Sequence, residues 1–355
     1  MADIAVRAGS RVFEMIQAGA FHFDRVTSYV GPAVGPRWLI AAGFDKTFLG
    51  NDLLGRQRPV VLAGSSAGAL RFAAWLQPGA LESYERLVDG YIHMSFDRDV
   101  TPRIVLDSVK AVIDGYIEDD AVPFALAHKR YRLAVTTARA RNLAASEIDW
   151  IQRIGLGCGF LANGLHAAWL NMFFRRVVFF SGPMPPRFCC RGGFTGKTVP
   201  LNVANFRHAL LASSAIPLVV SGVRDIFGAP NGVYRDGGLM DYHLNQRYAE
   251  KGDEVVLLFH HQERIVPGWL DKRLRYREAA PDFIENVLMV QPTAEFIAKL
   301  PGGKIPDRDD FAHYVDDPGL RIRNWRRAAA LADSLGEQFL ELMASDRIRA
   351  VVQKM

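Results

Sequence analysis

Cysteine, long apolar runs and dense basic tracts are all scarce in this chain of 355 residues. The three cysteines are Cys158 and the adjacent pair Cys189 and Cys190, an odd set whose spacing suits neither a disulfide framework nor a zinc site. No uninterrupted stretch of about 18 apolar residues occurs, which argues against a transmembrane helix. We therefore expect reduced thiols and no metal site.

The chain is mildly basic but has no feature of a nucleic-acid-binding protein. The net charge is +5, but no recognised nucleic-acid motif accompanies it, so nucleic acid is not an expected partner. Residues 1–21 lack a continuous apolar segment behind a basic start, and we expect no cleaved secretory signal. These features predict a cytoplasmic protein. A mildly basic chain without a membrane-spanning helix can still contact a membrane peripherally.

Short apolar segments alternate with helical patterns along the chain. Strands are expected at 25–30, 58–63, 131–137, 176–180 and 254–259. Helices are expected at 7–20, 38–49, 69–76, 209–215 and 321–352. This alternation predicts an α/β fold with a mostly parallel central sheet.

The run Gly64-Ser65-Ser66-Ala67-Gly68 has the form Gly-x-Ser-x-Gly and stands between an expected buried strand and an expected helix. A sharp turn there exposes the serine hydroxyl, and the glycines leave room for the close packing that such a turn needs. The N–H of the following residue, Ala67, points to where an oxyanion would form. Ser66 is therefore the predicted nucleophile of an acyl hydrolase.

A serine hydroxyl needs a base that removes its proton. Asp236 precedes Gly237 and Gly238, a combination that suits a tight loop able to bring a carboxylate close to another backbone. On its own an Asp-Gly-Gly run is more often a plain turn, so Asp236 is at this point a candidate base.

Three segments in order resemble the patatin-like phospholipases: Gly64–Gly68, residues 208–217 and the Asp236-Gly237-Gly238 loop. The similar region runs from about Val26 to about Leu258. The resemblance implies a three-layer α/β/α fold in which a Ser66–Asp236 dyad, without histidine, hydrolyses lipid acyl esters through an acyl-enzyme. It also implies that no cofactor is needed and that the substrate is a phospholipid or a related lipid ester.

The chain divides by this resemblance into three parts. Residues 1–24 are an expected N-terminal helical segment, 25–262 the catalytic domain, and 263–355 a mainly helical extension packed on the same domain. Within the second part, 143–175 is rich in bulky apolar residues and is a candidate lid or insertion, with core packing as the alternative.

The loop expected to bind the oxyanion departs from the glycine-rich pattern of the family. It reads Gly31-Pro32-Ala33-Val34-Gly35-Pro36, and its two prolines have no N–H to donate. The expected donors are Gly31, Ala33 and Val34, or Gly35, together with Ala67 from the turn. Losing one donor typically costs about 100- to 1000-fold in rate.

Three other interpretations stay open. His243, His260 and His261 lie downstream of Asp236 and could complete a Ser-Asp-His triad. The proline-containing loop is also compatible with a lipid- or membrane-binding relative that turns over slowly. An esterase or thioesterase for small soluble acyl substrates is the third.

Overall fold

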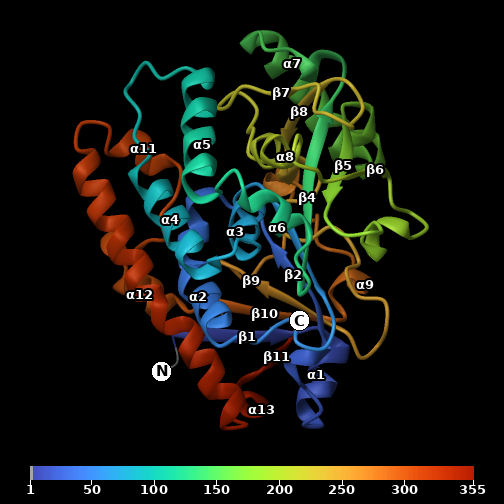
Figure 1. The fold of residues 1–355 in the computed structure, drawn as a ribbon, viewed down its shortest axis with the longest axis vertical. Helices are drawn as coiled ribbons and strands as arrows, with labels where there is room; N and C mark the ends of the chain where they lie inside the picture. Colours follow the sequence, from blue (N-terminus) through green and yellow to red (C-terminus); the bar gives the residue numbers. More distant parts are fainter. Residues whose placement is uncertain (1–2) are drawn as a thin grey trace.

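The computed structural model describes residues 3–355 as an α/β protein built on one mixed, mostly parallel sheet (Figure 1). The strand order is β11-β1-β10-β9-β2-β3-β4-β5-β6, and β8 pairs with both β4 and β7. The strands are β1 (Ile4–Ala8), β2 (Val26–Gly31), β3 (Val60–Ser65), β4 (Tyr131–Ala140), β5 (Phe174–Phe180), β6 (Gly196–Pro200), β7 (Val223–Arg224), β8 (Val233–Asp236), β9 (Val255–Phe259), β10 (Val287–Pro292) and β11 (Gln353–Lys354).

Helices cover both faces of this sheet. The α-helices are α1 (Ser10–Gln17), α2 (Ala42–Gly50), α3 (Ala67–Trp75), α4 (Ala80–His93), α5 (Pro102–Tyr116), α6 (Ala121–Leu126), α7 (Asp149–Leu165), α8 (Phe206–Ser213), α9 (Pro281–Ile284), α10 (Ala294–Lys299), α11 (Asp309–His313), α12 (Pro318–Ala344) and α13 (Ile348–Val351). The long helix α12 runs along one side of the molecule beside α2 and α4 (Figure 1).

The central strands are buried on both faces. Along β9, Val255, Leu257 and Phe259 join the core under α2 and α3, whereas Val256 and Leu258 join the core on the opposite face. Continuous apolar strands of this kind are expected in a parallel sheet that is covered on both sides.

The parallel arrangement gathers the candidate residues at one edge of the sheet. Strands β10, β9, β2, β3 and β4 are mutually parallel. Ser66 directly follows β3, the proline-containing loop follows β2, and His260 follows β9. Ligand sites in open α/β sheets form at this carboxyl edge, at the ends of the strands.

The ends of the chain differ from the sequence prediction. Ile4–Ala8 forms β1, and the helix that follows it starts only at Ser10. Alternating burial of Ile4, Val6 and Ala8 against β10 explains the strand. β1 and β10 belong to the same sheet as β2 and β9, so residues before 25 and after 262 add strands to the central sheet.

Segment 143–175 forms α7 and a short 3-10 helix, η4 (Ala167–Met172), at one end of the molecule (Figure 1). Phe173 packs on a small core under this segment, but several apolar side chains face outward: Trp150, Ile154, Leu161, Leu165, Trp169 and Met172. Within residues 3–355, no helix combines the length and the apolar character needed to cross a membrane.

Candidate active site

Ser66 stands at a strained turn between β3 and α3. Its φ of 53° lies in the left-handed region that non-glycine residues seldom adopt, and its ψ is −125°. The flanking glycines are required by close backbone packing: a Cβ on Gly68 would lie 1.9 Å from the Gly31 carbonyl oxygen, and one on Gly64 would lie 2.5 Å from the Ala69 nitrogen. The turn has the geometry of a nucleophile elbow.

A second serine holds this turn in place. The Ser66 N–H donates to Ser213 Oγ at 2.8 Å, and the Ser213 hydroxyl donates to the Thr136 carbonyl at 2.7 Å. Ser213 ends α8 and is fully buried. It therefore connects the elbow to the neighbouring strand β4 and fixes the direction of the Ser66 side chain.

Asp236 is brought directly onto the serine. Ser66 Oγ donates to Asp236 Oδ2 at 2.6 Å, and both side chains are buried. The other carboxylate oxygen accepts from the Gly238 N–H at 2.7 Å. Burial raises the pKa of Asp236 to about 6, although the hydrogen bonds from Ser66 and Gly238 and the charges of Lys272 and Arg308 act in the opposite direction. A carboxylate with this pKa is a stronger base than an ordinary aspartate.

The position of Asp236 follows from its neighbours in the fold. It ends β8, opposite Thr137 of β4, and its N–H donates to the Ala215 carbonyl at 2.9 Å. A Cβ on Gly237 would lie 2.1 Å from the Thr136 carbonyl oxygen, so only glycine allows this approach. The predicted pair, which is separated by 170 residues, thus meets through the pairing of β8 with β4.

The loop after β2 presents fewer oxyanion donors than expected. The Ala33 N–H donates to the Tyr242 carbonyl at 2.7 Å, and the Val34 N–H donates to the Pro32 carbonyl at 3.1 Å. Gly31 closes β2 in register with Gly64 of β3. The N–H groups of Ala33 and Val34 are therefore occupied, whereas those of Gly35, in the same loop, and Ala67, in the elbow, have no hydrogen-bond acceptor among the described residues. Gly35 and Ala67 are thus the residues whose N–H groups are free to donate to an oxyanion.

An apolar cavity of about 710 Å³ opens on Ser66. Its walls come from α3, α5 and the region of α11, and include the side chains of Leu70, Met94, Phe96, Val105, Ile216 and Phe311. No residue of 143–175 lines it. The size and lining suit the hydrocarbon part of a ligand.

A second, polar cavity of about 260 Å³ meets the first at Ser66 and also contains Asp236. Three cationic side chains line it: Arg37, Lys272 and Arg308. No sequence signal marks Lys272 and Arg308 as site residues, because both lie far along the chain, beyond the segments that resemble the patatin-like phospholipases.

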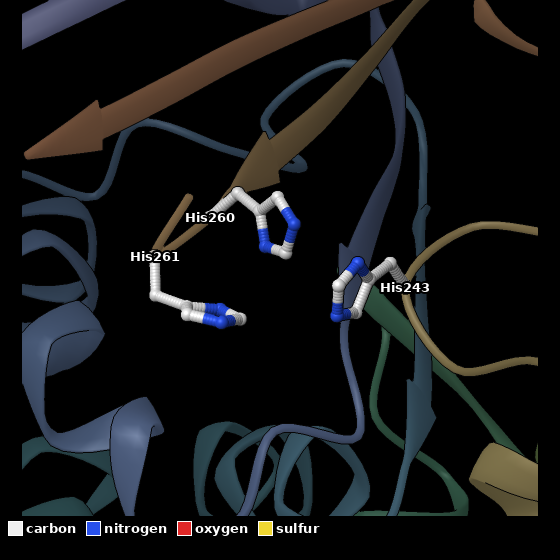
Figure 2. A group of neighbouring side chains, drawn as sticks. All are labelled: His243, His260 and His261. Atoms are coloured by element: carbon white, nitrogen blue, oxygen red, sulfur yellow. The ribbon is translucent and has the colours of Figure 1, made fainter. Parts of the chain in front are cut away.

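The three histidines form a group of their own, with their rings gathered together (Figure 2). His243 Nδ1 accepts from the Val266 N–H at 2.9 Å, and His260 Nε2 donates to the Arg264 carbonyl at 3.3 Å. None of the hydrogen bonds formed by these rings in the described part of the chain reaches Ser66 or Asp236. The geometry therefore does not assemble the alternative triad.

This histidine group also bears on metal binding. One nitrogen of each ring lies within 4.8 Å of the others. Because His243 Nδ1 accepts a hydrogen bond, its Nε2 carries the proton in the neutral ring and has no lone pair for a metal. Burial lowers the pKa of all three rings, that of His260 to about 4. The group thus offers two free lone pairs, fewer than a zinc site requires.

Comparison with known proteins adds no family assignment. No protein-family model matches the chain, and no curated protein matches it.

Proposed function

We propose that this protein is a patatin-like serine acyl hydrolase that cleaves lipid acyl esters with a Ser66–Asp236 dyad. The observation that carries the proposal is the 2.6 Å hydrogen bond from Ser66 Oγ to Asp236 Oδ2, made where an apolar and a polar cavity meet. The strained elbow and the raised pKa of Asp236 give further support.

The proposed reaction has two steps. Asp236 takes the Ser66 proton as Oγ attacks the ester carbonyl, the alcohol leaves with that proton, and an acyl-serine remains. Asp236 then takes a proton from water, whose oxygen attacks the acyl carbon, and the carboxylic acid leaves as Ser66 is regenerated. The N–H groups of Gly35 and Ala67 would stabilise the oxyanion in both steps.

A fluorophosphonate probe tests this proposal because it reacts with activated serines. We expect covalent labelling of Ser66, with a rate that rises with pH through about 6 and is level above it, since Asp236 must be ionised to accept the proton. Mass spectrometry of the labelled protein locates the adduct, and Ser66→Ala is expected to abolish it.

The matched control is Ser65→Ala. Ser65 ends β3, and its hydroxyl forms no hydrogen bond within the described part of the chain, so this variant should label like the wild type. A folded wild-type protein that is not labelled would favour the second candidate function, a lipid-binding relative with little turnover. The occupied N–H groups of Ala33 and Val34 are the observation behind that candidate.

Peripheral membrane contact through α7 and η4 belongs to the same proposal. Leu161 and Leu165 are four residues apart on α7 and are 67% and 76% exposed. Replacing both by serine should weaken binding to vesicles of phosphatidylglycerol and phosphatidylcholine by about tenfold or more, because each leucine can bury apolar surface in the interface. Co-sedimentation with vesicles measures the change.

Leu81 on α4 supplies the control for this change. It is 42% exposed, and α4 lies apart from α7 (Figure 1), so Leu81→Ser should leave vesicle binding unaltered. Equal vesicle binding by the Leu161→Ser/Leu165→Ser protein and the wild type would contradict a membrane role for α7.

A further inference from the structure

Three cations surround the polar cavity and come from three separate parts of the chain. Arg37 lies in the 3-10 helix η2 (Gly35–Ala41), Lys272 in the 3-10 helix η7 (Trp269–Arg273), and Arg308 immediately before α11. Within residues 3–355 none of these cations forms an ion pair, and only Asp236 and Asp309 supply carboxylates to the cavity. The cavity therefore carries excess positive charge beside the nucleophile.

Holding these charges together is unfavourable without an anion. Loss of hydration where Lys272 lines the cavity, followed by repulsion from Arg37 and Arg308, lowers its pKa to about 8. A cleft that is lined by like charges is a candidate site for a ligand of the opposite charge. Guanidinium groups are well suited to a planar or tetrahedral oxyanion because they donate several N–H bonds in fixed directions.

The aromatic side chains in the same cavity argue against a cationic head group. Lys272 Nζ lies 4.5 Å from the centre of the Tyr242 ring and 5.7 Å from that of Trp269. These ring faces could otherwise hold a quaternary ammonium group. Because the Lys272 ammonium already occupies them, a choline-type group would meet both a filled site and a like charge.

We propose that the polar cavity is a phosphate subsite, and that the substrate is an acyl ester whose alcohol half carries a phosphomonoester. The inference rests on the proposed hydrolase activity. The acyl chain would occupy the 710 Å³ apolar cavity, the ester carbonyl would lie at Ser66, and the phosphate would lie between Arg37, Lys272 and Arg308. A 1-acylglycerol 3-phosphate has all three parts in this order.

A kinetic comparison uses two substrates that differ only in the phosphate, 1-dodecanoylglycerol 3-phosphate and 1-dodecanoylglycerol. We expect the wild type to prefer the phosphate ester by at least about tenfold in kcat/KM, since hydrogen bonds to charged groups are worth this much or more. Lys272→Gln and Arg308→Gln should each reduce that preference by about tenfold, mainly through KM. Arg273→Gln removes an exposed neighbouring charge that does not line the cavity and should leave the preference unchanged.

A binding arm makes the test independent of turnover. In the Ser66→Ala protein, calorimetry with the non-hydrolysable ethers 1-dodecylglycerol 3-phosphate and 1-dodecylglycerol should show at least about tenfold tighter binding of the phosphate. Lys272→Gln and Arg308→Gln should reduce this difference. Inorganic phosphate should bind far more weakly than the ether phosphate. This result would show that the site recognises a phosphate attached to a lipid rather than free phosphate.

The outcomes separate the two proposals. Equal kcat/KM for the two dodecanoyl esters, with Ser66-dependent hydrolysis of both, would overturn the phosphate subsite and leave the hydrolase standing. Selective binding of the ether phosphate by a protein that hydrolyses neither ester would overturn the hydrolase and leave the phosphate subsite standing. Inorganic phosphate that binds as tightly as the ether would also overturn the lipid assignment, as would an equal loss on both esters in the Lys272 and Arg308 variants.

Discussion

Asp236→Asn is expected to lower kcat for ester hydrolysis by about 100- to 10,000-fold, the range that removal of a general base usually costs. The asparagine oxygen can still accept the Gly238 N–H, which donates to Asp236 at 2.7 Å in the wild type, so the loop should keep its shape. The amide cannot take the Ser66 proton. Initial rates on a soluble dodecanoyl ester, measured above pH 7, check this result.

The same variant should not be less stable than the wild type. The pKa of Asp236 is raised from 3.8 to about 6, so the folded state favours its protonated form. The wild type therefore loses stability as pH rises from about 4 to about 6, by up to about 3 kcal/mol. Asparagine does not ionise, so the Asp236→Asn protein does not lose this stability. Its thermal midpoint at pH 7.5 should equal or exceed that of the wild type.

These two readouts together distinguish a catalytic from a structural role. An inactive Asp236→Asn protein that also melts early would point to a folding defect rather than a missing base. Near-normal kcat in a stable protein would contradict the dyad, and dependence on His260 would then have to be tested in its place.

The proposed nucleophile and base, Ser66 and Asp236, could both be picked out from the sequence for a local reason. The Gly64–Gly68 turn and the Asp236-Gly237-Gly238 loop are short segments whose glycines are required by close backbone contacts, with Gly31 in one case and Thr136 in the other. A local steric requirement for glycine is visible in the sequence as a short motif of neighbouring residues. The central α/β alternation was visible for the same reason, because each buried strand forms a continuous apolar run.

The features that were missed depend on contacts between distant segments. β1 is too short to show a clear period, and it forms by pairing with β10 almost 300 residues later. The Ala33 N–H looked available as an oxyanion donor until the fold placed the Tyr242 carbonyl 2.7 Å away. Ser213 was part of the recognised segment, but its bonds to the Ser66 N–H and the Thr136 carbonyl could not be read from its neighbours.

Gly68→Ala is expected to have the largest effect of any single methyl group added to the site. Its Cβ would lie 1.9 Å from the Gly31 carbonyl oxygen and 2.2 Å from the Gly31 carbonyl carbon, and neither backbone atom can rotate away. The start of α3 must therefore move from the end of β2, which displaces both Ser66 and the Ala67 N–H. We expect a loss of at least about 3 kcal/mol in the free energy of unfolding, because overpacking against backbone leaves no side chain to adjust.

The catalytic loss should exceed what instability alone explains. A displacement of about 1 Å at the reacting groups can cost about 100-fold in rate, so the folded fraction of Gly68→Ala should be at least that much slower. Gly115→Ala on α5 is the matched control: no atom lies within 4 Å of its added Cβ, and alanine is the better helix former. Urea denaturation and ester hydrolysis of both variants give the comparison. If Gly68→Ala is as stable and active as Gly115→Ala, the close contact between α3 and β2 cannot be what sets the position of Ser66.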